Sequence, residues 1–153
     1  MNIKEMDTKG INMTIEFYKN YFGEDSMCRR SIDNRIDCVA AKNKQIYLIE
    51  TKIRDNELQD FQVNGKYKLG FMIEKIKIDY IQEIIKEFDE KKIKGHYINF
   101  LKDAVVVFDI TNFQGELHKI WCNTTTHGSN RIKKEKEIYF IPLKNNIFVC
   151  NTN

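Results

Sequence analysis

The segment from Arg35 to Lys52, RIDCVAAKNKQIYLIETK, decides the fold of this chain. Residues 35–40 and 45–52 have the length and composition of strands, and the residues between them predict a tight turn. Within that turn, Asn43 is a residue type that tolerates a positive φ. The uninterrupted apolar run Ile46–Ile49 is typical of a strand buried on both faces. We therefore expect a hairpin whose second strand lies in the middle of a sheet.

The turn also determines which residues of the two strands face each other. If Lys42 pairs with Gln45 across the turn, continuing the pairing outward places Asp37 directly opposite Glu50. The Cβ atoms of two such residues lie roughly 4.5–5.5 Å apart. Lys52 follows two residues after Glu50, so its side chain shares the same face of the strand.

Two carboxylates in this position repel each other, and like charges directly opposite destabilise a sheet. A divalent cation between them reverses the sign of the interaction. Mg²⁺ takes one or two carboxylates and fills its other positions with water and phosphate oxygens. With Lys52 on the same face, the arrangement suits metal-assisted hydrolysis of a phosphodiester. The structural alternative is a strand end at the solvent, with an ion pair between Lys52 and Asp37 or Glu50.

The rest of the chain predicts two helices and several further strands. The first helix carries an apolar stripe formed by Ile11, Ile15, Tyr18 and Phe22. A second helix is expected to begin with Asp79 as its cap. Residues 55–78 remain open between helix and strand. The expected helices span 7–22 and 79–92, and further strands are expected at 96–101, 104–111, 116–122, 137–141 and 146–150. This order predicts an α/β (α+β) fold.

Length and composition limit the class of protein. The chain has 153 residues, of which 42% are hydrophobic and 31% charged, and no linker is visible, so we expect one domain over residues 1–153. Its net charge is +3, although residues 91–153 alone carry ten basic and five acidic side chains. No apolar run approaches the roughly 20 residues of a membrane span, and the N-terminus lacks a signal-peptide pattern. We therefore expect an intracellular, cytoplasmic protein.

The motif formed by Asp37, twelve intervening residues and Glu50-x-Lys52 resembles the PD-(D/E)xK nuclease superfamily. This superfamily includes type II restriction enzymes, Holliday-junction resolvases and some homing endonucleases. The resemblance covers roughly residues 8–90, and it departs from the pattern at Ile36, where the motif has Pro. It implies a restriction-endonuclease-like core, in which a central mixed β-sheet is flanked by helices.

The resemblance also implies roles for individual residues. Asp37 and Glu50 correspond to the ligands of Mg²⁺, and the backbone carbonyl of Thr51 to a further ligand. Lys52 corresponds to the residue that orients or activates the attacking water. Many members carry a Glu on the first helix, which Glu16 matches, although Glu16 also suits a solvated helix face. The implied products carry a 5′-phosphate and a 3′-hydroxyl.

A polar segment near the C-terminus offers candidate contacts to DNA. Its side chains are of types that neutralise phosphates or form hydrogen bonds with base edges. An ordinary exposed loop leading into the strand at Glu137 is an equal alternative. The candidate residues are His127, Ser129, Asn130, Arg131, Lys133 and Lys134.

These features together predict a Mg²⁺-dependent, sequence-specific endonuclease of double-stranded DNA, of the type II restriction kind. Because one such site cuts one strand, double-strand cleavage implies a homodimer on a roughly palindromic sequence. Two alternatives remain open. One is a structure-specific nuclease such as a Holliday-junction resolvase, and the other is a catalytically inactive DNA-binding relative.

Overall fold

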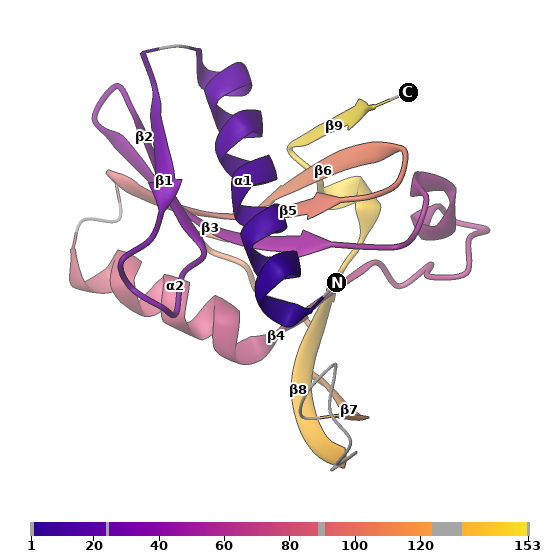
Figure 1. The fold of residues 1–153 in the computed structure, drawn as a ribbon. Helices are drawn as coiled ribbons and strands as arrows, with labels where there is room; N and C mark the ends of the chain where they lie inside the picture. Colours follow the sequence, from indigo (N-terminus) through magenta and orange to yellow (C-terminus); the bar gives the residue numbers. More distant parts are fainter. Residues whose placement is uncertain (1, 24, 89–90, 124–132, 153) are drawn as a thin grey trace.

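The computed structural model describes residues 2–23, 25–88, 91–123 and 133–152. This part of the chain contains two helices, two short 3₁₀ helices and the strands of two sheets (Figure 1). They are α1 (Ile3–Phe22), β1 (Met27–Arg30), β2 (Cys38–Lys42), β3 (Gln45–Ile53), η1 (Leu58–Phe61), β4 (Phe71–Glu74), α2 (Lys75–Glu87), β5 (Ile93–Phe100), β6 (Ala104–Asp109), β7 (His118–Asn123), β8 (Lys133–Ile141), η2 (Leu143–Asn145) and β9 (Phe148–Asn151).

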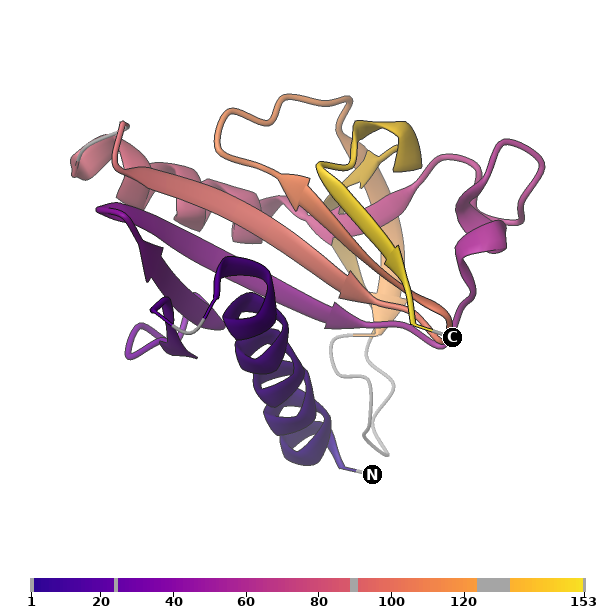
Figure 2. The same cartoon turned by 90° about the horizontal axis from the view of Figure 1, so that it is seen from above.

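The larger sheet has the strand order β1-β2-β3-β5-β6-β9. Strand β3 lies in its interior, antiparallel to β2 and parallel to β5, so the sheet is mixed. Helices α1 and α2 cover opposite faces of it (Figure 2). The expected α/β (α+β) class, with a central mixed sheet flanked by helices, is confirmed. A smaller antiparallel sheet has the order β4-β8-β7.

The hairpin forms with the expected register. Asn43 and Lys44 adopt φ values of 51° and 65° in the turn. Lys42 pairs with Gln45, and the ladder continues to the pair formed by Cys38 and Ile49. The first strand is shorter than expected, because residues 35–37 precede β2 instead of belonging to it.

Helix α1 begins four residues before the expected start. Asn2 caps it: its side chain accepts a hydrogen bond from the N–H of Glu5, whose carboxylate accepts one from the N–H of Asn2. This reciprocal capping box satisfies two N–H groups that would otherwise lack partners. The expected apolar stripe faces the sheet, and its buried members are Ile11, Tyr18 and Phe22.

The segment 55–78 is neither all helix nor all strand. Only residues 58–61 form a 3₁₀ turn, while 71–74 form β4 and α2 follows at once. The expected helix start at Asp79 is therefore wrong, because this residue lies inside α2, where it pairs with Lys75 one turn earlier. Strand β4 forms because it pairs with β8, which lies some 65 residues later in the chain. The further strands predicted after residue 95 all form, with shifted ends.

Two apolar clusters hold the layers together. One lies between the larger sheet, α2 and the smaller sheet, and includes Phe71, Ile81 and Tyr97. The other lies between the larger sheet and α1, and includes Tyr18 and Ile49. Among the described residues, no helix is both long and apolar enough to cross a membrane.

The start of β4 yields a first prediction. Gly70 has a φ of 112°, and a Cβ added there would lie 2.1 Å from the carbonyl oxygen of Ile141. Gly70→Ala should therefore lower the free energy of unfolding by about 3 kcal/mol, as measured by urea denaturation. Leu69→Ala is the control, because the Leu69 side chain is 57% exposed and should change stability by less than about 0.5 kcal/mol. Equal unfolding midpoints for the two variants would contradict this account.

Candidate active site

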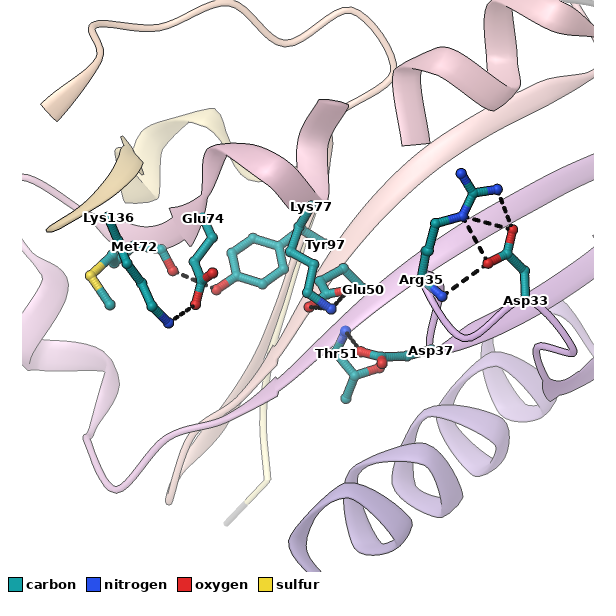
Figure 3. A network of polar contacts seen from close by, with 10 residues as sticks. All are labelled: Asp33, Arg35, Asp37, Glu50, Thr51, Met72, Glu74, Lys77, Tyr97 and Lys136. Carbon is teal, nitrogen blue, oxygen red and sulfur yellow. Dashed lines mark hydrogen bonds and ion pairs between the residues drawn. The ribbon is translucent and has the colours of Figure 1, made fainter. Parts of the chain in front are cut away.

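The hairpin carries both acids and the lysine of the motif to one cavity. Asp37, Glu50 and Lys52 are all among the residues that line a space of about 420 Å³ between α1, the end of β3, and β4. The expected pairing of Asp37 with Glu50 does not belong to the ladder, because the ladder ends with Cys38 and Ile49 and Asp37 immediately precedes β2. Asp37 nevertheless lies near enough to Glu50 to line the same cavity. Figure 3 shows the two acids side by side. The structure thus brings together the three residues on which the sequence-based interpretation depends.

Backbone and side-chain contacts hold Asp37 in one orientation. The Oδ2 atom of Asp37 accepts a hydrogen bond of 2.8 Å from the backbone N–H of Thr51. The Thr51 side chain points to the face of β3 opposite to that of Glu50, and its hydroxyl lies 2.8 Å from the hydroxyl of Thr14 on α1. A Cβ added at Gly10 would lie only 3.2 Å from Thr51 Cγ2, so α1 approaches the strand closely here. Helix α1 therefore supports the strand end that carries the site.

Glu50 is a buried carboxylate with an elevated pKa. Its residue is only 9% exposed, and the Nζ atom of Lys77 lies 3.2 Å from Oε1 and 3.3 Å from Oε2. Burial, followed by the negative charge of Asp37, raises the pKa of Glu50 to about 8, while Lys77 and Lys52 act in the opposite direction. The site therefore holds a carboxylate that gains from any added positive charge.

A polar network fixes the wall of the cavity formed by β4. The backbone carbonyl of Met72 accepts hydrogen bonds from the Arg54 guanidinium at 2.7 Å and from the Tyr97 hydroxyl at 2.8 Å. Arg54 also donates a hydrogen bond of 2.7 Å to the Asn99 side chain. Because Arg54 follows β3 and Tyr97 belongs to β5, these bonds tie the smaller sheet to the larger one beside the site.

Glu16, the expected acid on the first helix, does not line this cavity. It lies on an exposed face of α1, beside a separate shallow hollow. Asp7 of the same helix lines the cavity instead. The two residues are nine positions apart, which is about two and a half turns, so they point to opposite sides of the helix.

The DNA-contact candidates are only partly described. His127, Ser129, Asn130 and Arg131 lie outside the described residues. Lys133 and Lys134 are exposed at the beginning of β8.

Several charged residues of the cavity were missed from the sequence, among them Asp7, Arg30, Glu74 and Lys77. Asp7 had a usable signal, because it precedes the buried Ile11 by four residues and therefore shares its helix face. Lys77 and Glu74 had none, because the boundary between β4 and α2 depends on long-range pairing.

The donor set fits a hard divalent cation. Among the described residues, no cluster of three or more His, Cys, Asp or Glu side chains is arranged to hold a metal ion. The carboxylates of Asp37 and Glu50 remain, and one or two carboxylates suffice for Mg²⁺ when water and phosphate oxygens complete its shell. Burial, followed by the charge of Asp37, raises the pKa of Glu50, and a bound divalent cation would favour its ionised form. Thr51 also lines the cavity.

Comparisons with known proteins add one structural likeness. No protein-family model matches the sequence, and no curated protein matches it. Among solved structures, the chain is similar to Hjc, a Holliday junction resolvase from the archaeal hyperthermophile Archaeoglobus fulgidus. The two are 13% identical, the match covers 86% of this chain and 84% of that chain, and the TM-score is 0.48. The proposal below therefore rests on the residues of the cavity.

The pKa of Glu50 predicts how stability depends on pH without divalent ions. Between about pH 4.5 and pH 8 the folded chain keeps the Glu50 proton that the unfolded chain has lost. Stability from this group is therefore present at low pH and lost as the pH rises through that window. Glu50→Gln should remove this loss, so its stability advantage over the parent chain should grow by about 1.4 kcal/mol for each pH unit between about pH 4.5 and pH 8.

Urea denaturation in EDTA at several pH values measures this difference, with Glu87→Gln on the exposed end of α2 as the control. Parallel stability curves for Glu50→Gln and the parent chain would show that the folded state does not hold this proton.

Proposed function

We propose that this chain is a divalent-metal-dependent nuclease that hydrolyses phosphodiester bonds in DNA. The observation that carries the proposal is the convergence of Asp37, Glu50 and Lys52 on one cavity from the ends of two neighbouring strands. Two carboxylates with a lysine beside them form a site for a cation and an anion together, which a metal-bound phosphodiester supplies.

Each residue has a distinct part in this proposal. Asp37 and Glu50 would hold Mg²⁺, with the Thr51 carbonyl as a further ligand, and the ion would supply positive charge to the phosphoryl oxygens and lower the pKa of water. Lys52 would orient the attacking water and donate a hydrogen bond to a non-bridging phosphate oxygen, which would favour in-line attack. The expected products carry a 5′-phosphate and a 3′-hydroxyl.

Lys77 and the hydrogen bond from Thr51 hold the two acids in position before the reaction. Lys77 offsets the charge of the buried Glu50, and the Thr51 N–H fixes one oxygen of Asp37. The acids are therefore held in position before a cation binds, which reduces the cost of organising the site.

For the form of the substrate, we favour DNA shape over base sequence. The cationic residues at the cavity, Arg30, Lys52 and Lys77, suit phosphate groups, which carry no sequence information. We propose the structure-specific alternative, such as junction cleavage, in place of the restriction-type specificity expected from the sequence, and the assay below distinguishes the two. Because symmetric cleavage of two strands requires two sites, we also propose a homodimer.

Lys52→Ala tests the activity itself. The substitution should lower the Mg²⁺-dependent cleavage rate at least about 100-fold, because a cation at the reacting phosphate is lost. The melting temperature should stay unchanged, since Lys52 is exposed. Cleavage of a four-way junction and of supercoiled plasmid is compared, with Lys94→Ala, exposed on β5, as the matched control.

Each outcome of this assay separates one class of protein. Paired nicks in the junction support the shape-directed nuclease, whereas discrete plasmid fragments support the sequence-specific one. DNA binding without cleavage in either Mg²⁺ or Mn²⁺ would identify a catalytically inactive relative, and full activity of Lys52→Ala would overturn the assignment of the site.

A second pair of variants decides which acid of α1 serves the site. Asp7→Asn should lower the cleavage rate about 10- to 100-fold, because a negative charge that lines the cavity is lost. Glu16→Gln should leave the rate unchanged, because Glu16 does not line the cavity. The rates are measured at saturating Mg²⁺ and again under limiting Mg²⁺. If Glu16→Gln lowered the cleavage rate more than Asp7→Asn does, Glu16 and not Asp7 would be the acid of α1 that serves the site.

A further inference from the structure

The two strands β7 and β8 form a ribbon that extends beyond the larger sheet (Figure 1). From their register, the side chains divide between two faces, because paired residues share a face and successive residues alternate. We call these the Lys134 face and the Trp121 face. On the outer part of the ribbon, the Lys134 face carries Ile120, Cys122, Lys134 and Lys136, and the Trp121 face carries Lys119, Trp121, Lys133, Glu135 and Glu137.

The two faces differ in charge. On the Trp121 face, two lysines are balanced by two glutamates, and Lys119 lies 3.7 Å from Glu135. Among the described residues of the ribbon, the Lys134 face carries Lys134 and Lys136 and no acid from β7 or β8. Glu74 of β4 pairs with Ile138 in the register, so it lies on the same side as Lys136, with which it forms an ion pair of 2.8 Å. The Lys134 face therefore owes its net positive charge to Lys134, and the Trp121 face has no net charge.

The Lys134 face is continuous with the candidate active site. Lys136 pairs with Glu74 of β4 at 2.8 Å, and Glu74 and Met72 both line the cavity that holds Glu50. Figure 3 shows these residues in one row that runs from Lys136 past Glu74 and Lys77 to Glu50 and Asp37. A polyanion whose reacting phosphate lies at Glu50 can therefore continue along the ribbon on this face.

We propose that the Lys134 face binds the phosphate backbone of the DNA on one side of the cleavage site, and that the Trp121 face stays in solvent. This inference rests on the proposed function and extends it, because it assigns a path for the DNA outside the cavity. It also separates Lys134 from Lys133, which are neighbours in the sequence but lie on opposite faces. Charge complementarity and continuity with the cavity support the phosphate backbone of DNA as the ligand of this face.

The test compares Lys134→Ala with Lys133→Ala, in EDTA so that no cleavage occurs. Binding of a fluorescent duplex and of a four-way junction is titrated at several salt concentrations. Loss of one phosphate contact should reduce the slope of log K against log salt by about 1 and weaken binding about fivefold at 0.15 M salt. Lys134→Ala should show this change, and Lys133→Ala and Lys119→Ala should match the parent chain.

Trp121 provides a second readout, since it is the single tryptophan of the chain and is 70% exposed. Acrylamide quenching of its fluorescence should be the same with and without DNA, because the DNA lies on the other face. Protection of Trp121 by DNA, or equal effects of Lys133→Ala and Lys134→Ala in a chain that binds DNA, would overturn the ribbon assignment alone. Absence of DNA binding by the parent chain would overturn the proposed function, and the ribbon assignment with it.

Discussion

The proximity of two carboxylates, one of them buried, is the constraint on which the rest of this structure depends. Glu50 lies in the central strand β3 and Asp37 lies near it, just before β2, so burial and then repulsion raise the pKa of Glu50. A buried charge without a partner costs several kcal/mol. The ammonium of Lys77 offsets this cost in the structure, and a divalent cation would do so more completely. The fold must therefore place positive charge next to the Glu50 carboxylate.

The smaller sheet determines where this positive charge lies, because it positions Lys77. Strand β4 runs directly into α2, so the position of β4 fixes where the first turn of α2 presents Lys77. The Met72 carbonyl is in turn held by Arg54 and Tyr97, which belong to the end of β3 and to β5. Pairing of β4 with β8 thus has a consequence at the candidate active site, although neither strand contributes a residue of the sequence motif.

The sequence predicted the local part of this arrangement and missed the long-range part. The hairpin register followed from one turn, because Asn43 and Lys44 accept positive φ and the strand period then fixes every pair. That step predicted that Asp37 lies near Glu50, and both line one cavity although the ladder ends one pair before them. Lys77 escaped prediction because a four-residue strand has no signal without its partner β8. Glu16 was favoured by the resemblance over Asp7, although helix geometry places Asp7 beside the site.

The distribution of charge matters more for DNA binding than its sum. A net charge of +3 is modest for a protein that binds a polyanion, and by itself it favours recognition through a few specific base contacts. On the ribbon, however, alternation along β8 gathers Lys134 and Lys136 on one face and confines Glu135 and Glu137 to the other. Screening limits surface charges to about 8 Å at physiological salt. A phosphate on the Lys134 face is therefore affected by Lys134, and by Lys136 with its partner Glu74, more than by the net charge of the chain. A nearly neutral chain can therefore present a locally cationic surface beside its candidate active site.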